Sequence, residues 1–201
     1  TEAELAIQAI DSPWKVPYDG ALRAAPEQFT APATATGCKG LLQEARKTIR
    51  PWQRKLYAAK QYSVLLIFQA LDAAGKDGAI REVFEDLDPV NVQVCAFKRP
   101  TINELRHDFL WRTSCRLPER GEIAVFNRSY YEEVLTVRVH PEFLDAQYAG
   151  APLDKEALWP ARYRAIREHE RHLATANTLI LKFWLNVSPA TQARRFLERL
   201  D

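Results

Sequence analysis

Four compact apolar runs divide the chain and predict four buried strands. The first run, Ser63 to Gln69, is bounded by polar and glycine-rich sequence. Similar runs recur at Val92 to Phe97, Glu122 to Phe126 and Leu179 to Val187. Short, continuous apolar runs are typical of strands that are covered on both faces of a parallel sheet.

Helical periodicity fills the intervals between these runs. From Leu42 to about Ala59, apolar residues step by three and four, which predicts an amphipathic helix. Pro51 predicts a kink in that helix, or else two shorter helices that meet there. Further helices are predicted at Lys76 to Asp86, Ile102 to Leu117, Tyr130 to Val134 with its continuation left open, Glu156 to Ala176, and Pro189 to Leu200.

Strands that alternate with helices in this way predict an α/β fold. We expect a three-layer α/β/α arrangement with a doubly wound parallel sheet, in which right-handed crossovers bring helices to both faces. In such folds ligands bind at the carboxyl ends of the strands. The candidate chemistry is therefore sought in the residues that directly follow each strand.

The two ends of the chain have a different character. Residues 1–40 hold several of the 12 prolines and no sustained periodicity, which predicts an extended arm with a short helix at Ala3 to Ile10. Residues 41–201 are expected to form one domain. The last predicted helix runs into the terminus, so we expect a further strand beyond Asp201. The chain has no methionine, and its native start is also expected to be missing.

Composition narrows the class of protein. The chain has 201 residues, of which 47% are hydrophobic and 27% charged, and this excludes collagen-like, low-complexity and wholly disordered proteins. Its longest apolar run, Val64 to Phe68, is too short to span a bilayer, so we expect a soluble, cytoplasmic protein without a membrane partner. Cys38, Cys95 and Cys115 form no C-x-x-C pair, which indicates reduced thiols rather than a disulfide framework or a zinc cluster.

Charge gives a weaker indication of the ligand. The net charge of +2 is too small to indicate a nucleic-acid binder. Most of the 28 cationic residues are arginine, however, and the planar guanidinium grips phosphate with two hydrogen bonds. A phosphate-bearing ligand is consistent with this preference.

The first strand leads into a candidate phosphate-binding loop, A-L-D-A-A-G-K-D-G at residues 70–78. Small residues let backbone amides turn inward at a helix start, where phosphate binds. The usual pattern is G-x-x-x-x-G-K-[ST]; here Ala70 replaces the first glycine and Asp77 replaces the magnesium-binding hydroxyl. Lys76 is predicted to hold phosphate. A carboxylate next to phosphate is expected when a cation binds both groups, which would explain Asp72. A role as a helix N-cap would explain Asp72 equally well.

Polar residues also follow the third predicted strand. Asn127 and Arg128 end it, and Glu132 comes five residues after Asn127. The third strand lies beside the first in doubly wound sheets, so these residues should face the loop. A magnesium ion between Asp72 and Asn127, with Arg128 on phosphoryl oxygens, would provide what phosphoryl transfer requires. The structural alternative is a capped strand end.

Several separated motifs resemble the polyphosphate kinase 2 family, in particular the subgroup called class III. They are residues 70–80, 97–101, 107–112 and 121–140, and the resemblance extends from about Leu42 to the end of the chain. It implies a P-loop kinase with a thymidylate-kinase-like core and a helical lid. It also implies direct, in-line, Mg2+-dependent transfer of the terminal phosphoryl group between inorganic polyphosphate and a nucleotide. Adenine nucleotides are the expected acceptors, with guanine nucleotides as a second candidate, and the expected assembly is a homodimer or homotetramer.

The resemblance assigns roles to individual residues. Asp72 matches the magnesium-binding loop acid, Lys76 the phosphate-loop lysine and Arg128 the phosphate-gripping arginine. Asn127 and Glu132 match the class III form of the third-strand motif, which implies that both nucleoside monophosphates and diphosphates are accepted. The remaining loop residues, Ala73, Ala74, Gly75, Asp77 and Gly78, are implied to bind phosphate with Lys76.

Two further groups are implied to bind substrate. Related kinases bind the acceptor nucleotide at positions that match Lys98, Arg99, His107, Asp108 and Arg112. For His107 and Asp108 a plain place on a helix surface is an equal alternative. A lid over about residues 142–175 is implied to close on polyphosphate through a basic stripe, and the alternative is a solvated face paired with Glu168 and Glu170. The stripe consists of Arg164, Arg167 and Arg171.

Other residues are given structural interpretations. His169 and His172 lie three apart on a helix without further ligands, which does not indicate a metal site. Cys115 has no histidine partner. A solvated helix face is preferred to a second anion patch for Arg194, Arg195 and Arg199. Two other functions stay open: a conventional ATP-dependent nucleotide kinase, which uses the same strand and loop pattern, and a polyanion-binding module without catalysis.

Overall fold

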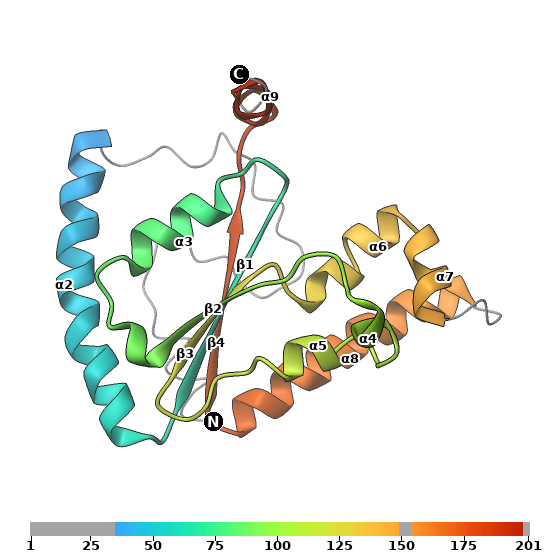
Figure 1. Ribbon diagram of the computed structural model, residues 1–201, viewed down its shortest axis with the longest axis horizontal. Coiled ribbons are helices and arrows are strands. Elements are labelled where there is room, and N and C mark those ends of the chain that lie inside the picture. Colours follow the sequence, from blue (N-terminus) through green and yellow to red (C-terminus); the bar gives the residue numbers. More distant parts are fainter. Residues whose placement is uncertain (1–34, 149–153, 199–201) are drawn as a thin grey trace.

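One parallel sheet of four strands organises the chain. The computed structural model describes residues 35–148 and 154–198 (Figure 1). The strand order is β2-β3-β1-β4, and all three pairings are parallel. The strands are β1 (Ser63–Ala70), β2 (Val92–Ala96), β3 (Ile123–Asn127) and β4 (Thr178–Leu185). The four predicted strands are confirmed, with β4 two residues shorter than predicted at its end, and β3 lies beside β1 as expected.

Helices cover both faces of this sheet, which confirms the three-layer prediction. On one face, Phe68 and Val125 pack with Ile80 of α3 (Lys76–Phe84) and with Leu56 of α2 (Ala35–Ala59). On the other face, the core is closed by α8 (Lys155–Thr175). Figure 1 shows α2 and α3 on one side of the strands and α8 on the other.

The helix α2 corrects the predicted boundary of the N-terminal arm. It begins at Ala35 rather than Leu42, so residues 35–40 are helical, and it continues through Pro51 as one helix rather than two. The predicted short helix at Ala3 to Ile10 lies outside the described residues. Two buried polar side chains fix α2 to the domain. The Arg46 guanidinium contacts the end of α3, and Gln53 Nε2 donates to Asn91 Oδ1 over 2.7 Å.

The single helix predicted from Ile102 to Leu117 is wrong. The segment forms two short helices, α4 (Ile102–Leu105) and α5 (Trp111–Ser114). The side chain of Asp108 accepts a hydrogen bond from the backbone N–H of Leu110, and this local turn interrupts the helix. The backbone between the two helices thereby contributes to a pocket wall instead of a continuous helix face.

The segment after β3 is also built of short pieces. The predicted helix Tyr130 to Val134 is a 3-10 helix, η3 (Tyr130–Glu133), in which the N–H of Val134 donates three residues back to Tyr131, and the Ser129 side chain caps its start. It is followed by α6 (Thr136–Val139) and α7 (Glu142–Tyr148). The 3-10 helix η2 (Pro89–Asn91) precedes β2, and α9 (Pro189–Leu197) follows β4. No helix in the described part of the chain combines the length and the apolar character that a bilayer crossing requires.

Candidate active site

The loop between β1 and α3 lies at the carboxyl edge of the sheet. Gly75, at the N-cap of α3, has a φ of 86°, and Ala73 has a φ of 59°. Both residues adopt the left-handed conformation, which is strained for alanine and open to glycine. The loop therefore turns sharply into α3, whose first N–H groups have no helical partner and suit an anion.

Lys76 folds back over this loop. Its Nζ donates to the carbonyl oxygens of Ala70, over 3.2 Å, and Leu71, over 3.4 Å. Burial lowers the pKa of Lys76, and the neighbouring Arg128 cation lowers it further, although the carboxylates of Asp72 and Glu132 act in the opposite direction. The ammonium group is held where a substrate phosphate can replace the two carbonyl contacts.

Arg128 connects the end of β3 with the loop. Its backbone has a φ of 66°, and its N–H donates to the carbonyl of Phe68 on β1 over 3.0 Å. The guanidinium Nη2 lies 2.9 Å from Asp72 Oδ1, and Nη1 lies 3.4 Å from Glu132 Oε2. Parallel pairing sets this geometry, because the β1–β3 register aligns Phe68 with Asn127.

Glu132 is itself held in place by neutral donors. Its carboxylate accepts hydrogen bonds from Gln69 Nε2, over 3.0 Å, and from the Thr136 hydroxyl. Ser129 in turn donates to Gln69 Oε1 over 3.3 Å. Glu132 thus orients the Arg128 side chain through an ion pair on the side away from Asp72. The structure therefore brings Glu132, which was predicted from the sequence, together with Asp72 and Lys76.

The residues predicted to hold magnesium are paired differently from the prediction. Asp72 contacts Arg128, while the Asn127 amide donates to the carboxylate of Asp77. Within the described residues no group of three or more acidic, histidine or cysteine side chains forms a metal site. The oxygens of Asp72 and Asp77, which are exposed, and of the half-buried Asn127 are of the kind that magnesium binds, since magnesium takes one or two carboxylates and completes its shell with water and substrate phosphate.

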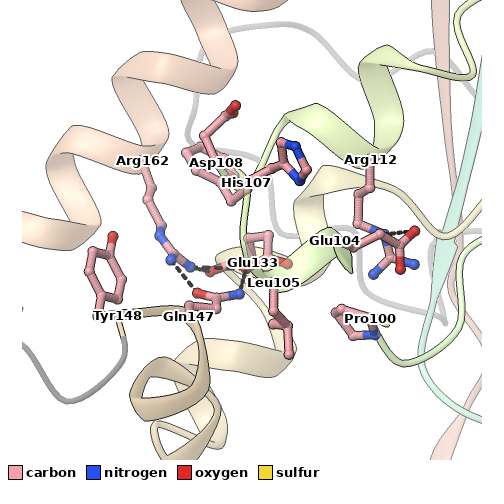
Figure 2. A pocket seen from close by; sticks show the side chains of 11 residues that line it. Pro100, Glu104, Leu105, His107, Asp108, Arg112, Glu133, Gln147, Tyr148 and Arg162 are labelled. Carbon is pink, nitrogen blue, oxygen red and sulfur yellow. Dashed lines mark hydrogen bonds and ion pairs between the residues drawn. The ribbon is translucent and has the colours of Figure 1, made fainter. Parts of the chain in front are cut away.

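A pocket lies beside the sheet edge, between the two short helices α4 and α5 and the segments η3, α7 and α8 (Figure 2). Of the residues predicted to bind the acceptor nucleotide, His107, Asp108 and Arg112 line this pocket, whereas the exposed side chains of Lys98 and Arg99 do not. Arg112 is bound to the backbone near them, since its Nη2 donates to the carbonyl of Lys98 over 2.8 Å. Lys98 is thereby linked to the pocket through Arg112, and three of the five predicted residues line the pocket itself.

Aromatic contacts shape the mouth of this pocket. The His107 ring stacks on Trp111 with centroids 3.9 Å apart and an interplanar angle of 11°. His107 Nδ1 lies 2.8 Å from the carbonyl oxygen of Asn103. The guanidinium of Arg112 lies over the Phe97 ring at 5.2 Å. These contacts hold the His107 and Arg112 side chains at the pocket rim.

The buried ion pair that forms the pocket floor was not predicted from the sequence. Arg162 Nη1 lies 3.1 Å from Glu133 Oε2, with side chains that are 3% and 6% exposed. Gln147 completes the network by donating to Glu133 and accepting from Arg162 (Figure 2). A signal was available, because Arg162 lies four residues from both Leu158 and Ile166 on the buried face of α8.

The basic stripe of α8 is not brought together with the phosphate loop. Arg164, Arg167 and Arg171 are all exposed, and helical geometry sets them opposite the face that buries Ile166 and Leu173. In the described part of the chain none of them pairs with Glu170, whose carboxylate binds Tyr130, Tyr131 and Lys182. The half of α8 that carries Ile166 and Leu173 belongs to the main core, so it is a fixed layer of the fold.

The helix α9 contributes residues that the sequence interpretation set aside. Arg195 was expected on a solvated face, but its Nη1 donates to the carbonyl of Ala73 in the loop over 3.2 Å. Gln192 Nε2 donates to the carbonyl of Asp72 over 2.8 Å. Arg194 is exposed as predicted and pairs only loosely with Glu198, at 3.6 Å. Arg199 lies outside the described residues.

The remaining candidates keep structural roles. His169 packs edge-on against Tyr130 at 5.6 Å, and burial lowers its pKa. His172 is exposed and joins no metal-binding group among the residues described. Cys95 is buried and Cys115 exposed, both as free thiols, and burial raises the pKa of Cys95.

The parallel sheet, the loop between β1 and α3, and the lysine and arginine at its mouth define a P-loop kinase fold. The family model described as Polyphosphate kinase 2 (PPK2) matches residues 36–201. This chain belongs to the polyphosphate kinase 2 family.

Individual relatives agree with this assignment. The chain is 52% identical over 163 residues to an ADP-polyphosphate phosphotransferase of Rhodopseudomonas palustris, a match that covers 80% of this chain and 56% of the relative. It is 47% identical over 149 residues to an AMP/ADP-polyphosphate phosphotransferase of Meiothermus ruber, covering 74% and 52%. The crystal structure of Polyphosphate Kinase 2 from Arthrobacter aurescens TC1 superposes with a TM-score of 0.80 at 36% identity, covering 92% of this chain and 64% of that one. The chain thus spans little more than half the length of the Rhodopseudomonas palustris and Meiothermus ruber relatives.

Proposed function

We propose that this chain carries a polyphosphate:nucleotide phosphotransferase site, which moves the terminal phosphoryl group of inorganic polyphosphate to ADP or AMP. The observation that carries the proposal is the contact of Arg128 with both Asp72 and Glu132 beside Lys76. Two cations and a loop acid then surround the place where a phosphoryl group would sit above α3. The names of the relatives, ADP- and AMP/ADP-polyphosphate phosphotransferase, support the same substrates.

The loop and its two cations bind the transferring end of polyphosphate. The backbone at Ala73, Gly75 and Gly78 is proposed to offer N–H donors, with Lys76 supplying an ammonium group, while the N–H of Ala74 is bonded to the carbonyl of Leu71. Arg128 grips a phosphoryl oxygen with its planar fork when it exchanges part of its contact with Asp72 for substrate. In a half-buried site such charges act more strongly on the substrate than they would in water.

We assign Asp72, Asn127 and Asp77 to the magnesium side of the site. A carboxylate repels phosphate, so Asp77, bonded to Asn127, suits the cation better than the phosphate contact that was first expected of it. Magnesium, when bound, neutralises charge on the phosphoryl oxygens and orients them for displacement. The three side chains would hold it through their oxygens, together with water and substrate.

The proposed transfer is a direct displacement. A terminal phosphate oxygen of the nucleotide attacks the terminal phosphorus of polyphosphate, a new P–O bond forms, and the bridging P–O bond breaks to leave a chain one phosphate shorter. Lys76 and Arg128 neutralise charge on the oxygens around the phosphorus. No side chain of the site is proposed as a nucleophile, because the oxygen of the nucleotide attacks the phosphorus directly.

The acceptor nucleotide is proposed to lie toward the pocket beside α4 and α5. Its rim carries His107 and Arg112, its floor carries the Arg162 pair, and its cavity volume is about 200 Å³. This is smaller than the roughly 300 to 1,000 Å³ of sites that enclose a small ligand, so the pocket is proposed to hold only part of the nucleotide. Lys98 and Arg99, which are exposed where β2 ends, are proposed to meet the phosphates of the acceptor rather than its base.

The longer part of a polyphosphate chain is proposed to reach the basic stripe Arg164, Arg167 and Arg171. These side chains are exposed and face away from the core, so they suit the distant phosphates of a long chain rather than the reacting one. The lid predicted over about residues 142–175 is proposed to be restricted to α7 and the first two turns of α8, before the buried Arg162, and the stripe lies on the part of the helix that stays fixed. A homo-oligomeric assembly remains a prediction of the family resemblance. A cytoplasmic location and the absence of a nucleic-acid or membrane partner remain predictions from the apolar runs and the net charge of the sequence.

The test distinguishes three functions by the phosphoryl donor that supports ATP formation and by whether any product forms at all. Purified protein is incubated with Mg2+, ADP and either long-chain polyphosphate or GTP, and ATP is measured. ATP formed only with polyphosphate supports the proposal, and AMP in place of ADP then tests the second acceptor. ATP formed only with GTP would show a conventional nucleotide kinase, and binding of polyphosphate without any product would show a polyanion-binding module.

A further inference from the structure

Two side chains of α9 hold the phosphate loop from outside. Gln192 and Arg195 lie three residues apart, so they project from the same face of the helix. Gln192 Nε2 donates to the carbonyl of Asp72 over 2.8 Å, and Arg195 Nη1 donates to the carbonyl of Ala73 over 3.2 Å. Figure 1 shows α9 above the carboxyl end of β4, the edge of the sheet at which the loop lies.

The position of α9 is set by the sequence that precedes it. Ser188 caps the helix by accepting a hydrogen bond from the N–H of Thr191 over 3.2 Å, and Pro189 occupies its first turn. Only Asn186 and Val187 separate β4 from this cap. Because β4 pairs with β1 along its whole length, from Ser63 to Ala70, the short connection delivers α9 to the end of β1.

The two contacts fix consecutive peptide planes of the loop. The carbonyl of one residue and the N–H of the next lie in the same plane and point in opposite directions. The contact to Ala73 therefore also orients the N–H of Ala74, which closes the turn on the carbonyl of Leu71 over 3.3 Å. This is the turn in which Ala73 adopts its strained left-handed conformation.

Asp72 is held from both sides by this arrangement. Its carboxylate contacts Arg128 of the β3 end, and its carbonyl contacts Gln192 of α9. The Arg195 guanidinium also lies against Gly75, where an added Cβ would come within 3.1 Å of Nη1. The loop is thus confined between the strand end that carries Arg128 and one face of α9.

We propose that Gln192 and Arg195 are positioning residues that keep the phosphate loop in its substrate-binding turn. The inference rests on the proposed function for its effect on catalysis, but the effect on the loop itself does not depend on it. Neither side chain needs to touch substrate: they act through the carbonyls of Asp72 and Ala73. Arg194, the neighbouring and exposed arginine of the same helix, provides a matched control.

The experiment measures the loop and the reaction in the same variants of the 201-residue chain. Hydrogen exchange of a peptide that spans residues 70–78 reports the loop, and the kcat and KM values for ADP and polyphosphate report the reaction. Gln192→Ala and Arg195→Ala are expected to speed exchange of this peptide and to lower kcat by about fivefold to tenfold, the size of one lost hydrogen bond, while the KM for ADP stays unchanged. Arg195→Lys, which keeps a donor, should recover part of the loss, and Arg194→Ala should match wild type.

Exchange of the loop peptide at the wild-type rate in both alanine variants would overturn the inference, as would an equal effect of Arg194→Ala. Thermal unfolding of each variant identifies any that loses its fold. If Arg195→Ala does so, the near-isosteric Gln192→Glu, which keeps the shape of the side chain but cannot donate, decides between the outcomes. A wild-type protein without polyphosphate-dependent transfer would contradict the proposed function, and the exchange rates would still decide the role of α9.

Discussion

Arg128 Nη2 lies 2.9 Å from Asp72 Oδ1, although the two residues are 56 positions apart in the chain. The contact joins the end of β3 to the phosphate loop that follows β1. It exists because parallel pairing aligns the ends of the two strands, and the left-handed backbone of Arg128 turns its side chain toward the loop. The proposed phosphoryl-binding and magnesium-binding residues lie on the two segments that this ion pair joins.

Asp72→Asn tests the assignment of this acid to magnesium. The side chain of Asp72 is 68% exposed, so the fold should remain while most Mg2+-dependent transfer is lost. The measurement is the initial rate of transfer as a function of Mg2+ concentration. Asp145→Asn, an exposed acid on α7, is the matched control and should follow the wild-type curve. Unchanged turnover of Asp72→Asn at every Mg2+ concentration would rule out the metal role.

The lowered pKa of Lys76 predicts an alkaline limit to polyphosphate binding. The ammonium form binds phosphate and the neutral amine does not, so affinity is present below the pKa of Lys76 and is lost as the pH rises through it. Because that pKa is lowered from 10.5, the loss should begin at a lower pH than for an ordinary lysine. This loss is a property of the free enzyme, so it should appear as a decline of kcat/KM for polyphosphate at alkaline pH, called the alkaline limb below.

Lys76→Arg provides the comparison for this pH profile. Arginine stays protonated across the accessible range, so the alkaline limb of kcat/KM should disappear even if the rate itself is reduced. A limb that persists unchanged in Lys76→Arg would assign the titration to another group.

Arg162→Met tests the buried ion pair beneath the pocket. It leaves the Glu133 carboxylate buried without its cation, which is expected to cost about 3–5 kcal/mol of unfolding free energy. Arg164→Met, two residues further along the same helix but exposed, should change this free energy by less than about 0.5 kcal/mol. Chemical denaturation of both variants makes the comparison, and equal free energies of unfolding would show that the pair does not hold the pocket floor.

Arg167→Ala tests whether the outer stripe of α8 meets polyphosphate. It should weaken binding of long polyphosphate more than binding of nucleotide, and the difference should shrink as salt is raised, because exposed charges are screened. Titration calorimetry at two salt concentrations measures both ligands. Arg120→Ala, an exposed arginine just before β3, is the control. An equal loss of affinity for both ligands would count against binding of polyphosphate by the stripe.

The strands and the phosphate loop could be predicted because their information is local. An apolar run such as Ser63 to Gln69 specifies a buried strand wherever it lies in the sheet. The phosphate loop consists of nine consecutive residues, 70–78. The parallel pairing of β1 with β3 is then sufficient to bring Asn127 and Arg128 to this loop. These parts of the fold and of the candidate site required only the order of elements along the chain.

The parts that were missed depend on tertiary contacts. The helix predicted from Ile102 to Leu117 is interrupted by a single side-chain turn at Asp108, which competes with the helical hydrogen bonds. From the sequence alone, Arg162 cannot be distinguished from the exposed arginines of α8. Only the tertiary structure shows that Glu133 and Gln147 bind its guanidinium group. Arg195 likewise belongs to a basic cluster by sequence, and only the pairing of β4 with β1 brings it to the loop.

The most direct test of polyphosphate-driven transfer at this loop is the initial rate of ATP formation from ADP, Mg2+ and long-chain polyphosphate, compared between wild type and Lys76→Ala. Lys76 anchors no part of the hydrophobic core, and its contacts are two loop carbonyls, so the variant should fold. The account predicts clear polyphosphate-dependent ATP formation by wild type and its loss in Lys76→Ala. An equal rate in both proteins, or no ATP from wild type, would contradict it.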